Sequence, residues 1–154
     1  MDAFFIFATK YLYLAVLGLL GLYVLMQPRD SQKRMAIFAV PAGLLALALG
    51  MLAGRFYFDP RPFVVGHFMP LVPHASDNGF PSDHALLVSA AAMIGTVWNR
   101  RLGIVLWALA LVVAVARVYV GVHHLVDVAG SFVISSAAVL AAYAAFRHWH
   151  KEIK

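Results

Sequence analysis

Polar residues able to do chemistry gather in three short clusters of an otherwise apolar chain. The clusters are Arg55 and Arg61 in RFYFDPRP, Ser82, Asp83 and His84 in FPSDH, and Arg117, His123 and Asp127 in ARVYVGVHHLVD. Ionisable side chains within apolar segments are costly to bury and therefore indicate function. Arg117 and Asp127 are the clearest cases, since apolar sequence flanks each of them.

The residue types of these clusters suit the binding of phosphate. A guanidinium group is planar, stays charged and can donate two parallel hydrogen bonds to phosphate oxygens. Arg55, Arg61 and Arg117 together would neutralise a phosphate and stabilise charge in the transition state. Ser82 stands where the N-cap of a helix is expected, so the free N–H groups after it, including that of Asp83, would add an anion site.

A second set of side chains could transfer the phosphoryl group. His123 and Asp127 are four residues apart, a spacing that places both on one face of a helix. An aspartate that accepts a hydrogen bond from one imidazole nitrogen leaves the other nitrogen free to attack phosphorus. His84 would then protonate the leaving oxygen. The pattern predicts a phosphohistidine intermediate that water hydrolyses.

A metal site is the main alternative use of these histidines and aspartates. The residues of ligand type are His84, His123, His124 and Asp127. Three nearby arginines would repel a cation, and the His123–Asp127 spacing serves the orientation of an imidazole equally well. We therefore expect no metal and no other cofactor.

The elements that must position these residues lie in a lipid solvent, as the composition shows. Of the 154 residues, 63% are hydrophobic and 12% are charged, against about 25% charged residues in a soluble domain. The absence of cysteine excludes disulfides, zinc–thiolate sites and a cysteine nucleophile. The formal net charge of +5 resides in short basic clusters between apolar runs, so it indicates membrane topology and not nucleic acid binding.

Five apolar segments are long enough, or nearly so, to cross a membrane, which takes ~20 apolar residues. They are residues 4–26, 35–54, 83–98, 102–120 and 122–146. The first is too long for the core of a signal peptide, so we expect a retained span. The sequence predicts an all-α, polytopic transmembrane bundle of five helices, or six, in a single domain over residues 1–154.

Two kinds of connection join these segments. Residues 27–34 and 99–101 are short and basic, whereas residues 55–82 are long and rich in proline and aromatic residues, which is typical of a functional loop. By the positive-inside rule, the basic connections and the C-terminus face the cytoplasm and the long loop faces outward. His67 and His74 of this loop fit contacts with a second phosphate and solvated positions equally well.

In these motifs the chain resembles the type 2 phosphatidic acid phosphatase family, which shares its site with vanadium haloperoxidases. The family pattern is a basic residue and Arg-Pro, then Pro-Ser-Gly-His, then Ser-Arg with a His six residues on and an Asp four beyond that. The matching residues are Arg61-Pro62, then Pro81-Ser82-Asp83-His84, then Arg117, His123 and Asp127. The resemblance covers about half the chain, residues 55–127, and implies a metal-independent membrane phosphatase of that fold.

Three departures from the family pattern bear on the site. Gly54 stands where the family has a lysine, and the adjacent Arg55 is the expected substitute. Asp83 replaces the glycine of the second motif, and an ion pair with an arginine would explain its carboxylate. Ala116 replaces the serine before Arg117. Five spans, where the family usually has six, leave one helix unaccounted for.

The segments SDNGFPSDH and RVYVGVHHLVD look most like the bacitracin-resistance branch of the family. That branch implies hydrolysis of undecaprenyl diphosphate, which recycles the lipid carrier of peptidoglycan synthesis at the outer face of the bacterial inner membrane. The implied partners are the polyprenyl diphosphate and membrane lipids, and no nucleic acid. The alternatives are a phosphatase for phosphatidylglycerol phosphate, phosphatidic acid or lipid A, and a non-catalytic anion or lipid transporter.

Overall fold

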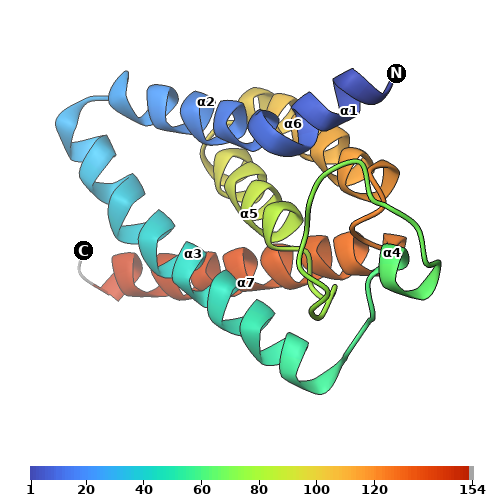
Figure 1. Cartoon of the computed structure of the whole chain (residues 1–154). Helices are drawn as coiled ribbons and strands as arrows, with labels where there is room; N and C mark the ends of the chain where they lie inside the picture. The colour runs from blue at the N-terminus through green and yellow to red at the C-terminus, as the bar shows by residue number, and fades with distance from the viewer. Residues whose placement is uncertain (153–154) are drawn as a thin grey trace.

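The computed structural model describes residues 1–152, which form an all-α bundle (Figure 1). In chain order the elements are α1 (Asp2–Phe7), the π-helical turn η1 (Ala8–Leu12), α2 (Tyr13–Leu25), α3 (Arg29–Phe56), α4 (Pro62–Val65), α5 (Asp83–Trp98), α6 (Arg100–Tyr119) and α7 (Leu125–Glu152). The first three elements form one continuous helix, Asp2–Leu25. The predicted all-α fold is confirmed, and the end of the predicted C-terminal tail, at Lys154, lies outside the described residues.

Four of these helices are long and apolar enough to cross a membrane. They are Asp2–Leu25, Arg29–Phe56, Arg100–Tyr119 and Leu125–Trp149. Large apolar side chains are exposed on each of them, for example Leu22, Leu44, Leu111 and Val133. Soluble monomers rarely expose this much apolar surface, whereas hydrocarbon chains solvate it. The chain is a multi-pass membrane protein, as its composition predicts.

The third predicted span, which is α5, differs from the others in length and surroundings. Its 16 residues extend about 24 Å, less than the roughly 30 Å of the hydrocarbon core. α5 lies in the middle of the bundle and packs against α2, α3, α6 and α7 (Figure 1). Because other helices surround it, the length of α5 need not match the thickness of the membrane.

Small side chains let the neighbours of α5 approach closely. Its buried positions include Ala85, Ala91, Ala92 and Gly95, and small residues favour close helix packing in membranes. A Cβ atom on Gly95 would lie 2.7 Å from Cδ1 of Leu106 in α6. This packing fixes α5 in the bundle and therefore fixes the FPSDH motif at its N-terminal end.

The predicted helix boundaries agree with the structure to within six residues, with one error that affects the site. The sequence predicts a last span from residue 122, whereas α7 begins at Leu125. Gly121 has a φ of +81°, a conformation that glycine adopts without strain, and the chain turns there after α6. His123 therefore lies in the α6–α7 connection and not on a helix face shared with Asp127.

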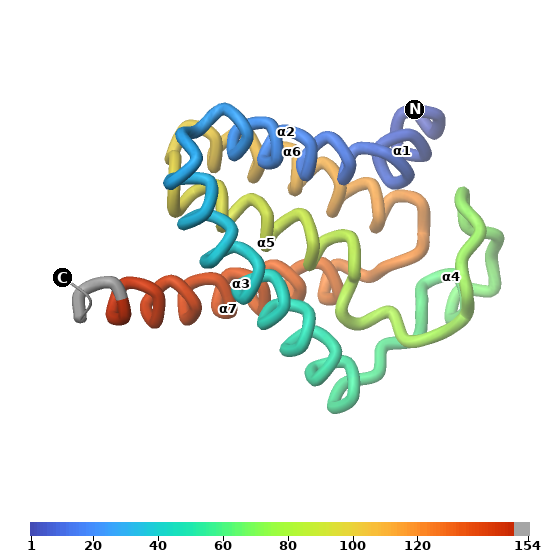
Figure 2. The backbone as a smooth tube through the Cα atoms, turned by 90° about the vertical axis from the view of Figure 1, so that its left-hand side faces the viewer, coloured from blue at the N-terminus to red at the C-terminus, as the bar shows by residue number. Residues whose placement is uncertain are grey.

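The connections alternate between two ends of the bundle (Figure 2). The long loop that carries α4 and the α6–α7 connection lie at one end, together with the N-terminus. The α2–α3 and α5–α6 connections lie at the other end, as does the C-terminal part of α7. The three motif clusters thus meet at one end of the bundle.

Candidate active site

Asn78 ties the long loop to the helix ends that frame the site. Its Nδ2 donates to the carbonyl oxygens of Gly54 and Tyr57, both at 3.0 Å. Its Oδ1 accepts from the backbone N–H of Asp59 at 2.9 Å and of Phe80 at 3.0 Å. An asparagine can do this because its amide carries both donors and acceptors. These four hydrogen bonds of Asn78 bring together the two ends of the loop, which hold the first and second motifs.

His123 lies at the centre of the site and is only 2% exposed. Its Nε2 lies 3.3 Å from Nη1 of Arg61 and 3.2 Å from Nη2 of Arg117. Guanidinium groups donate hydrogen bonds but cannot accept them, so Nε2 carries a lone pair. The proton is then on Nδ1, which lies 3.0 Å from the carbonyl oxygen of Gly79 and 3.3 Å from Oδ2 of Asp127. The imidazole is neutral, and its unprotonated nitrogen faces two cations.

Arg61 is buried, and both the long loop and the α6–α7 connection hold it. Its Nε donates to Oδ1 of Asp77 at 2.7 Å, a hydrogen bond that lowers the pKa of Asp77. Nη1 donates to the carbonyl oxygen of Val122 at 2.9 Å and Nη2 to that of Asn78 at 3.2 Å. These bonds join the long loop to the α6–α7 connection. Nη1 also faces Nε2 of His123, so the charge of Arg61 lies next to that nitrogen.

Arg117 is equally buried, but it keeps unused donor capacity. Its Nη2 lies 3.0 Å from Nε2 of His74 and 3.2 Å from Nε2 of His123, and its Nη1 donates to Oγ1 of Thr9 at 3.2 Å. The Nε–H group has no hydrogen-bond partner within the described residues. A buried guanidinium with a spare donor beside an unprotonated imidazole is suited to bind an oxygen of phosphate.

Asp127 contacts His123, but the two residues do not share a helix face as predicted. It lies in the first turn of α7, and its Oδ2 accepts the backbone N–H of His124 at 2.8 Å. This contact is one half of a capping box, and a negative charge is favourable at that end of a helix. The predicted contact is therefore present, but the helix cap and the preceding turn create it.

The second motif forms the start of α5, and Ser82 is its N-cap residue, as predicted. The Oγ of Ser82 makes no capping hydrogen bond and has no partner among the described residues. The ring of His84 packs edge-on against the ring of Tyr13 at 4.9 Å, and the charge of Arg117 acts on it. Ser82 and His84 thus lie at the site with polar atoms that a ligand can use.

Two residues predicted to bind phosphate, Asp83 through its backbone N–H and Arg55 through its guanidinium, have side chains outside the hydrogen-bond network. Asp83 is exposed and makes no ion pair in the described part of the chain, so its expected pairing with an arginine is not formed. Arg55 is exposed in the last turn of α3 and makes no hydrogen bond or ion pair with another described residue. α3 continues through Arg55 to Phe56, and the chain turns back over the helix ends only after that, so Arg61 reaches His123 and Arg55 does not.

Two partners of Arg117 lie outside the three motifs. The ring of His74, for which the sequence leaves a phosphate contact and a solvated position equally open, lies 6.0 Å from that of His123. Thr9 is 1% exposed and lies in η1, and such π-helical turns often mark functional positions. The available signal for Thr9 is a polar residue inside an apolar span.

The electrostatics of the site favour neutral imidazoles. Burial lowers the pKa of His123 below its usual value of 6.5, and the charges of Arg117 and Arg61 act in the same direction, against the hydrogen bond with Asp127. Burial and the charge of Arg61 also lower the pKa of His74. The neutral form of His123, with its free Nε2 lone pair, is therefore favoured at neutral pH.

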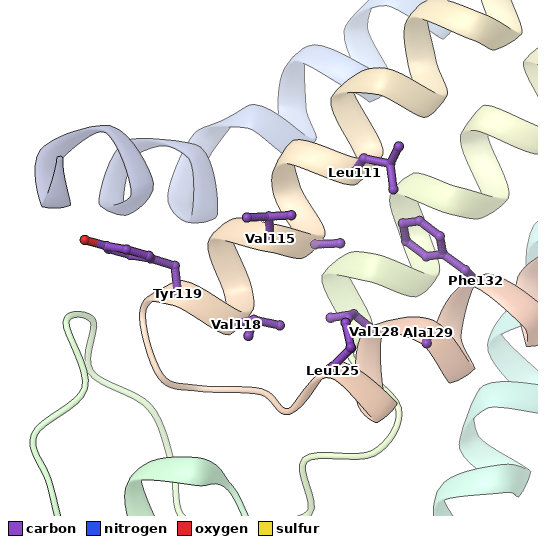
Figure 3. A pocket seen from close by; sticks show the side chains of 9 residues that line it. Leu111, Val115, Val118, Tyr119, Leu125, Val128, Ala129 and Phe132 are labelled. Carbon is purple, nitrogen blue, oxygen red and sulfur yellow. The ribbon is translucent and has the colours of Figure 1, made fainter.

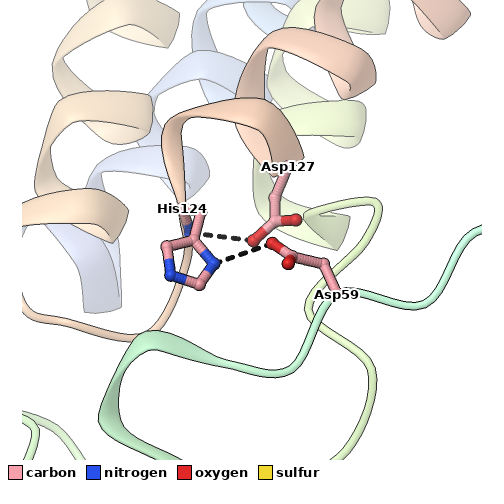
Figure 4. Close-up of side chains that lie close together, drawn as sticks. All are labelled: Asp59, His124 and Asp127. Carbon is pink, nitrogen blue, oxygen red and sulfur yellow. Dashed lines mark hydrogen bonds and ion pairs between the residues drawn. The ribbon is translucent and has the colours of Figure 1, made fainter. Parts of the chain in front are cut away.

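Asp59 and His124 form a second pair beside Asp127 (Figure 4). Oδ2 of Asp59 lies 2.7 Å from Nδ1 of His124. Ligand-type atoms of all three residues lie within 4.8 Å of one another, which makes them a candidate cation site. The 2.7 Å contact is a hydrogen-bond length, and the backbone N–H of His124 already occupies Oδ2 of Asp127. Hydrogen bonding therefore accounts for this arrangement.

An apolar groove runs between α6 and α7, with a volume of about 390 Å³ (Figure 3). Its lining includes Leu111, Val115, Val118, Leu125, Val128 and Phe132. Among the described residues no arginine, histidine or carboxylate lines this groove, so it is not the place of the chemistry.

A polar pocket of about 160 Å³ opens beside Arg61 and is also lined by Asp77 and Asp83. It shares Leu47, Asp83 and Leu86 with an apolar groove of about 490 Å³ between α3 and α5. A polar pocket next to an apolar groove suits an amphipathic ligand.

Comparison with known proteins gives relatives over most of the chain. Undecaprenyl-diphosphatase BcrC of Bacillus subtilis (strain 168) is 33% identical over 135 residues, which are 88% of this chain and 69% of that protein. Bacitracin transport permease protein BcrC of Bacillus licheniformis is 32% identical over 123 residues, 79% of this chain and 61% of that protein.

Solved structures and family models agree with these relatives. The crystal structure of Aquifex aeolicus LpxE is similar with a TM-score of 0.74 and 21% identity, over 93% of this chain and 85% of that one, which shows a common fold. Residues 35–151 match the model of the PAP2 superfamily. With this match over most of its length, the chain belongs to the PAP2 superfamily.

Proposed function

We propose that the protein hydrolyses undecaprenyl diphosphate to the monophosphate and inorganic phosphate through a phosphohistidine on His123. The observation that carries the proposal is the unprotonated Nε2 of His123 between the guanidinium groups of Arg61 and Arg117. A neutral nucleophile between two cations is suited to attack phosphorus, because the cations bind the phosphate oxygens and stabilise the transition state. The substrate in the name of the Bacillus subtilis relative supports this choice of lipid.

In the proposed reaction, Nε2 of His123 attacks the terminal phosphorus, and the bond from that phosphorus to the bridging oxygen breaks. His84, protonated once the anionic substrate is bound beside it, donates a proton to the leaving oxygen as general acid. Water then attacks the phosphohistidine with His84 as base, which releases inorganic phosphate and restores the neutral imidazole. Asp127 and the carbonyl oxygen of Gly79 keep the proton on Nδ1 throughout.

Phosphate binding in this scheme involves Arg61, Arg117 and the start of α5. Arg117 contributes its unused Nε–H group. The N-terminus of α5 contributes the hydroxyl of Ser82, the backbone N–H of Asp83 and the positive end of the helix dipole. Arg55 stays an expected phosphate contact on the strength of the family resemblance alone.

A lipid diphosphate fits the surroundings of His123 in two respects. The polar pocket beside Arg61 shares lining residues with the apolar groove between α3 and α5, and this proximity suits a phosphate group attached to a hydrocarbon tail. His74 contacts Arg117 and lies close to His123, where it can meet the second phosphate.

We further propose that the site faces the outside of a bacterial inner membrane, with the C-terminus in the cytoplasm. Basic residues concentrate at the end of the bundle opposite the site, and they include Arg29, Lys33, Arg34, Arg100 and Arg101. Excess arginine and lysine in short connections favours the cytoplasmic side. An outward site would give access to a lipid carrier that is released outside the cell.

The proposed activity is tested with purified protein in detergent micelles, given undecaprenyl diphosphate, phosphatidylglycerol phosphate or phosphatidic acid. We expect kcat/KM to be higher for undecaprenyl diphosphate by about tenfold or more, and we expect no loss on addition of a chelator, because no proposed step uses a metal. A preference for phosphatidic acid would favour another lipid phosphatase. Anion binding without phosphate release would favour a transporter, a function named in one relative.

Replacing His74 with alanine is expected to lower kcat/KM for undecaprenyl diphosphate about tenfold, since one hydrogen bond to a charged group is lost. Hydrolysis of phosphatidic acid, which has no second phosphate, should change by less than about twofold. The control is His67→Asn in the same loop, at an exposed position with a φ of 51° that asparagine tolerates. Equal losses on the two lipids would show that His74 only supports Arg117.

A further inference from the structure

The orientation of His123 depends on the two acceptors that face its Nδ1–H group. These are the carbonyl oxygen of Gly79 at 3.0 Å and Oδ2 of Asp127 at 3.3 Å. If either acceptor moves, the ring turns and Nε2 no longer points between the guanidinium groups. The groups that hold the acceptors therefore set the direction of attack, and Asp59 contributes to both.

The first acceptor is held by the backbone of Asp59. The carbonyl oxygen of Asp59 accepts the N–H of Gly79 at 2.8 Å, while the N–H of Asp59 donates to Oδ1 of Asn78 at 2.9 Å. A Cβ atom at residue 79 would lie 2.9 Å from Oδ2 of Asp127 and 3.0 Å from the carbonyl oxygen of Asp59. Only glycine lets these groups approach so closely, so the Gly79 peptide is confined between Asp59 and Asp127.

The second acceptor is held by the side chain of Asp59 through His124 (Figure 4). Oδ2 of Asp59 lies 2.7 Å from Nδ1 of His124, and the backbone N–H of His124 donates to Oδ2 of Asp127 at 2.8 Å. Residue 124 directly precedes α7, and its carbonyl oxygen accepts the N–H of Asp127 at 3.2 Å, whereas its own N–H group depends on the side chain of Asp127. The hydrogen bond with Asp59 fixes the side chain of His124, and with it the N–H group that holds Asp127.

We propose that Asp59 and His124 are positioning residues that fix both acceptors of the His123 Nδ1–H group. They thereby orient Nε2 toward phosphorus. This inference rests on the phosphohistidine mechanism proposed above. In the described part of the chain their side chains bond to each other and not to Arg61 or Arg117. Their loss should therefore slow formation of the phosphoenzyme without weakening the binding of substrate.

The test compares His124→Ala with His124→Asn in the purified full-length chain. The side-chain amide of asparagine can take the place of the Nδ1–H group and keep the hydrogen bond to Asp59, whereas alanine cannot. We expect kcat of the alanine variant to fall about 10- to 100-fold, with KM within about twofold and most of kcat restored by asparagine. Rapid quenching with substrate labelled on the terminal phosphate should show that phosphoenzyme formation is the slowed step.

A double variant tests whether Asp59 and His124 act through their shared hydrogen bond or contribute independently. Asp59→Ala should show the same defect as His124→Ala, and Asp59→Ala/His124→Ala should be no slower than the worse single variant, because all three lose one interaction. His67→Asn serves as the matched control at an exposed histidine. Losses that multiply in the double variant, or failure of His124→Asn to restore kcat, would overturn the inference.

The outcome also distinguishes this inference from the mechanism on which it rests. If His123→Ala still turned over, the phosphohistidine mechanism would fail, and the positioning roles with it. If His123→Ala were inactive while His124→Ala kept a kcat within about twofold of the wild type, only the positioning roles would fail.

Discussion

The His123→Ala variant is expected to lose at least about 10⁴-fold in kcat, because the attacking atom itself is removed. It should also form no labelled phosphoenzyme after rapid quenching with substrate labelled on the terminal phosphate. The wild type should give a label that is stable in base and lost in acid, the behaviour of a phosphorus–nitrogen bond. Phosphate release and label retention, measured on the same samples, check both expectations.

The same nucleophile sets the acid side of the pH profile. Attack needs neutral His123, and burial lowers the pKa of His123 below 6.5, so the neutral form persists at a lower pH than it would for a free imidazole. We therefore expect the acid limb of kcat/KM to lie below pH 6.5, once the ionisation of the substrate has been titrated separately in the same micelles. His67→Asn should behave as wild type in every measurement. A His123→Ala variant that still formed a labelled protein would contradict the assignment.

The fold could be predicted because lipid imposes simple requirements on the chain. Apolar runs of about 20 residues mark spans whatever their neighbours are, and α3 and α6 follow them closely. The short helix α5 shows the limit of this reasoning. The sequence of α5 predicts one more span. Its place in the middle of the bundle depends on how Ala85, Ala92 and Gly95 pack against other helices, and the sequence of α5 alone does not show this.

The site could be predicted in its residue types and less well in its geometry. The motifs name Arg61, Arg117, His123 and Asp127, and the structure brings these together. The predicted start of the last span at residue 122 is wrong, because the connection that turns at Gly121 continues to residue 124 and α7 begins only at Leu125.

The residues that the motifs do not name depend on the path of the long loop. His74 and Asp59 reach the site because the hydrogen bonds of Asn78 hold the long loop folded back over the helix ends. The composition of such a loop does not determine its path, so local sequence patterns could not have placed these side chains. Thr9 depends likewise on the packing of the first helix beside α6.

Arg117→Lys is expected to lower kcat/KM by about 10³-fold, although it keeps the charge. The guanidinium of Arg117 spans Thr9, His74 and His123 with separate donors and keeps its Nε–H group unused. A lysine ammonium is a single point with a shorter reach, so it cannot contact these groups and a phosphate oxygen together. The measurement is kcat/KM on undecaprenyl diphosphate.

Arg101→Lys is the matched control for this substitution, since Arg101 lies exposed in the first turn of the same helix at the opposite end. Its kcat/KM should stay within about twofold of the wild type. If Arg117→Lys retained more than about a tenth of the wild-type kcat/KM, a single positive charge would suffice at this position. The forked geometry of Arg117, and with it the assignment of its Nε–H group to a phosphate oxygen, would then be wrong.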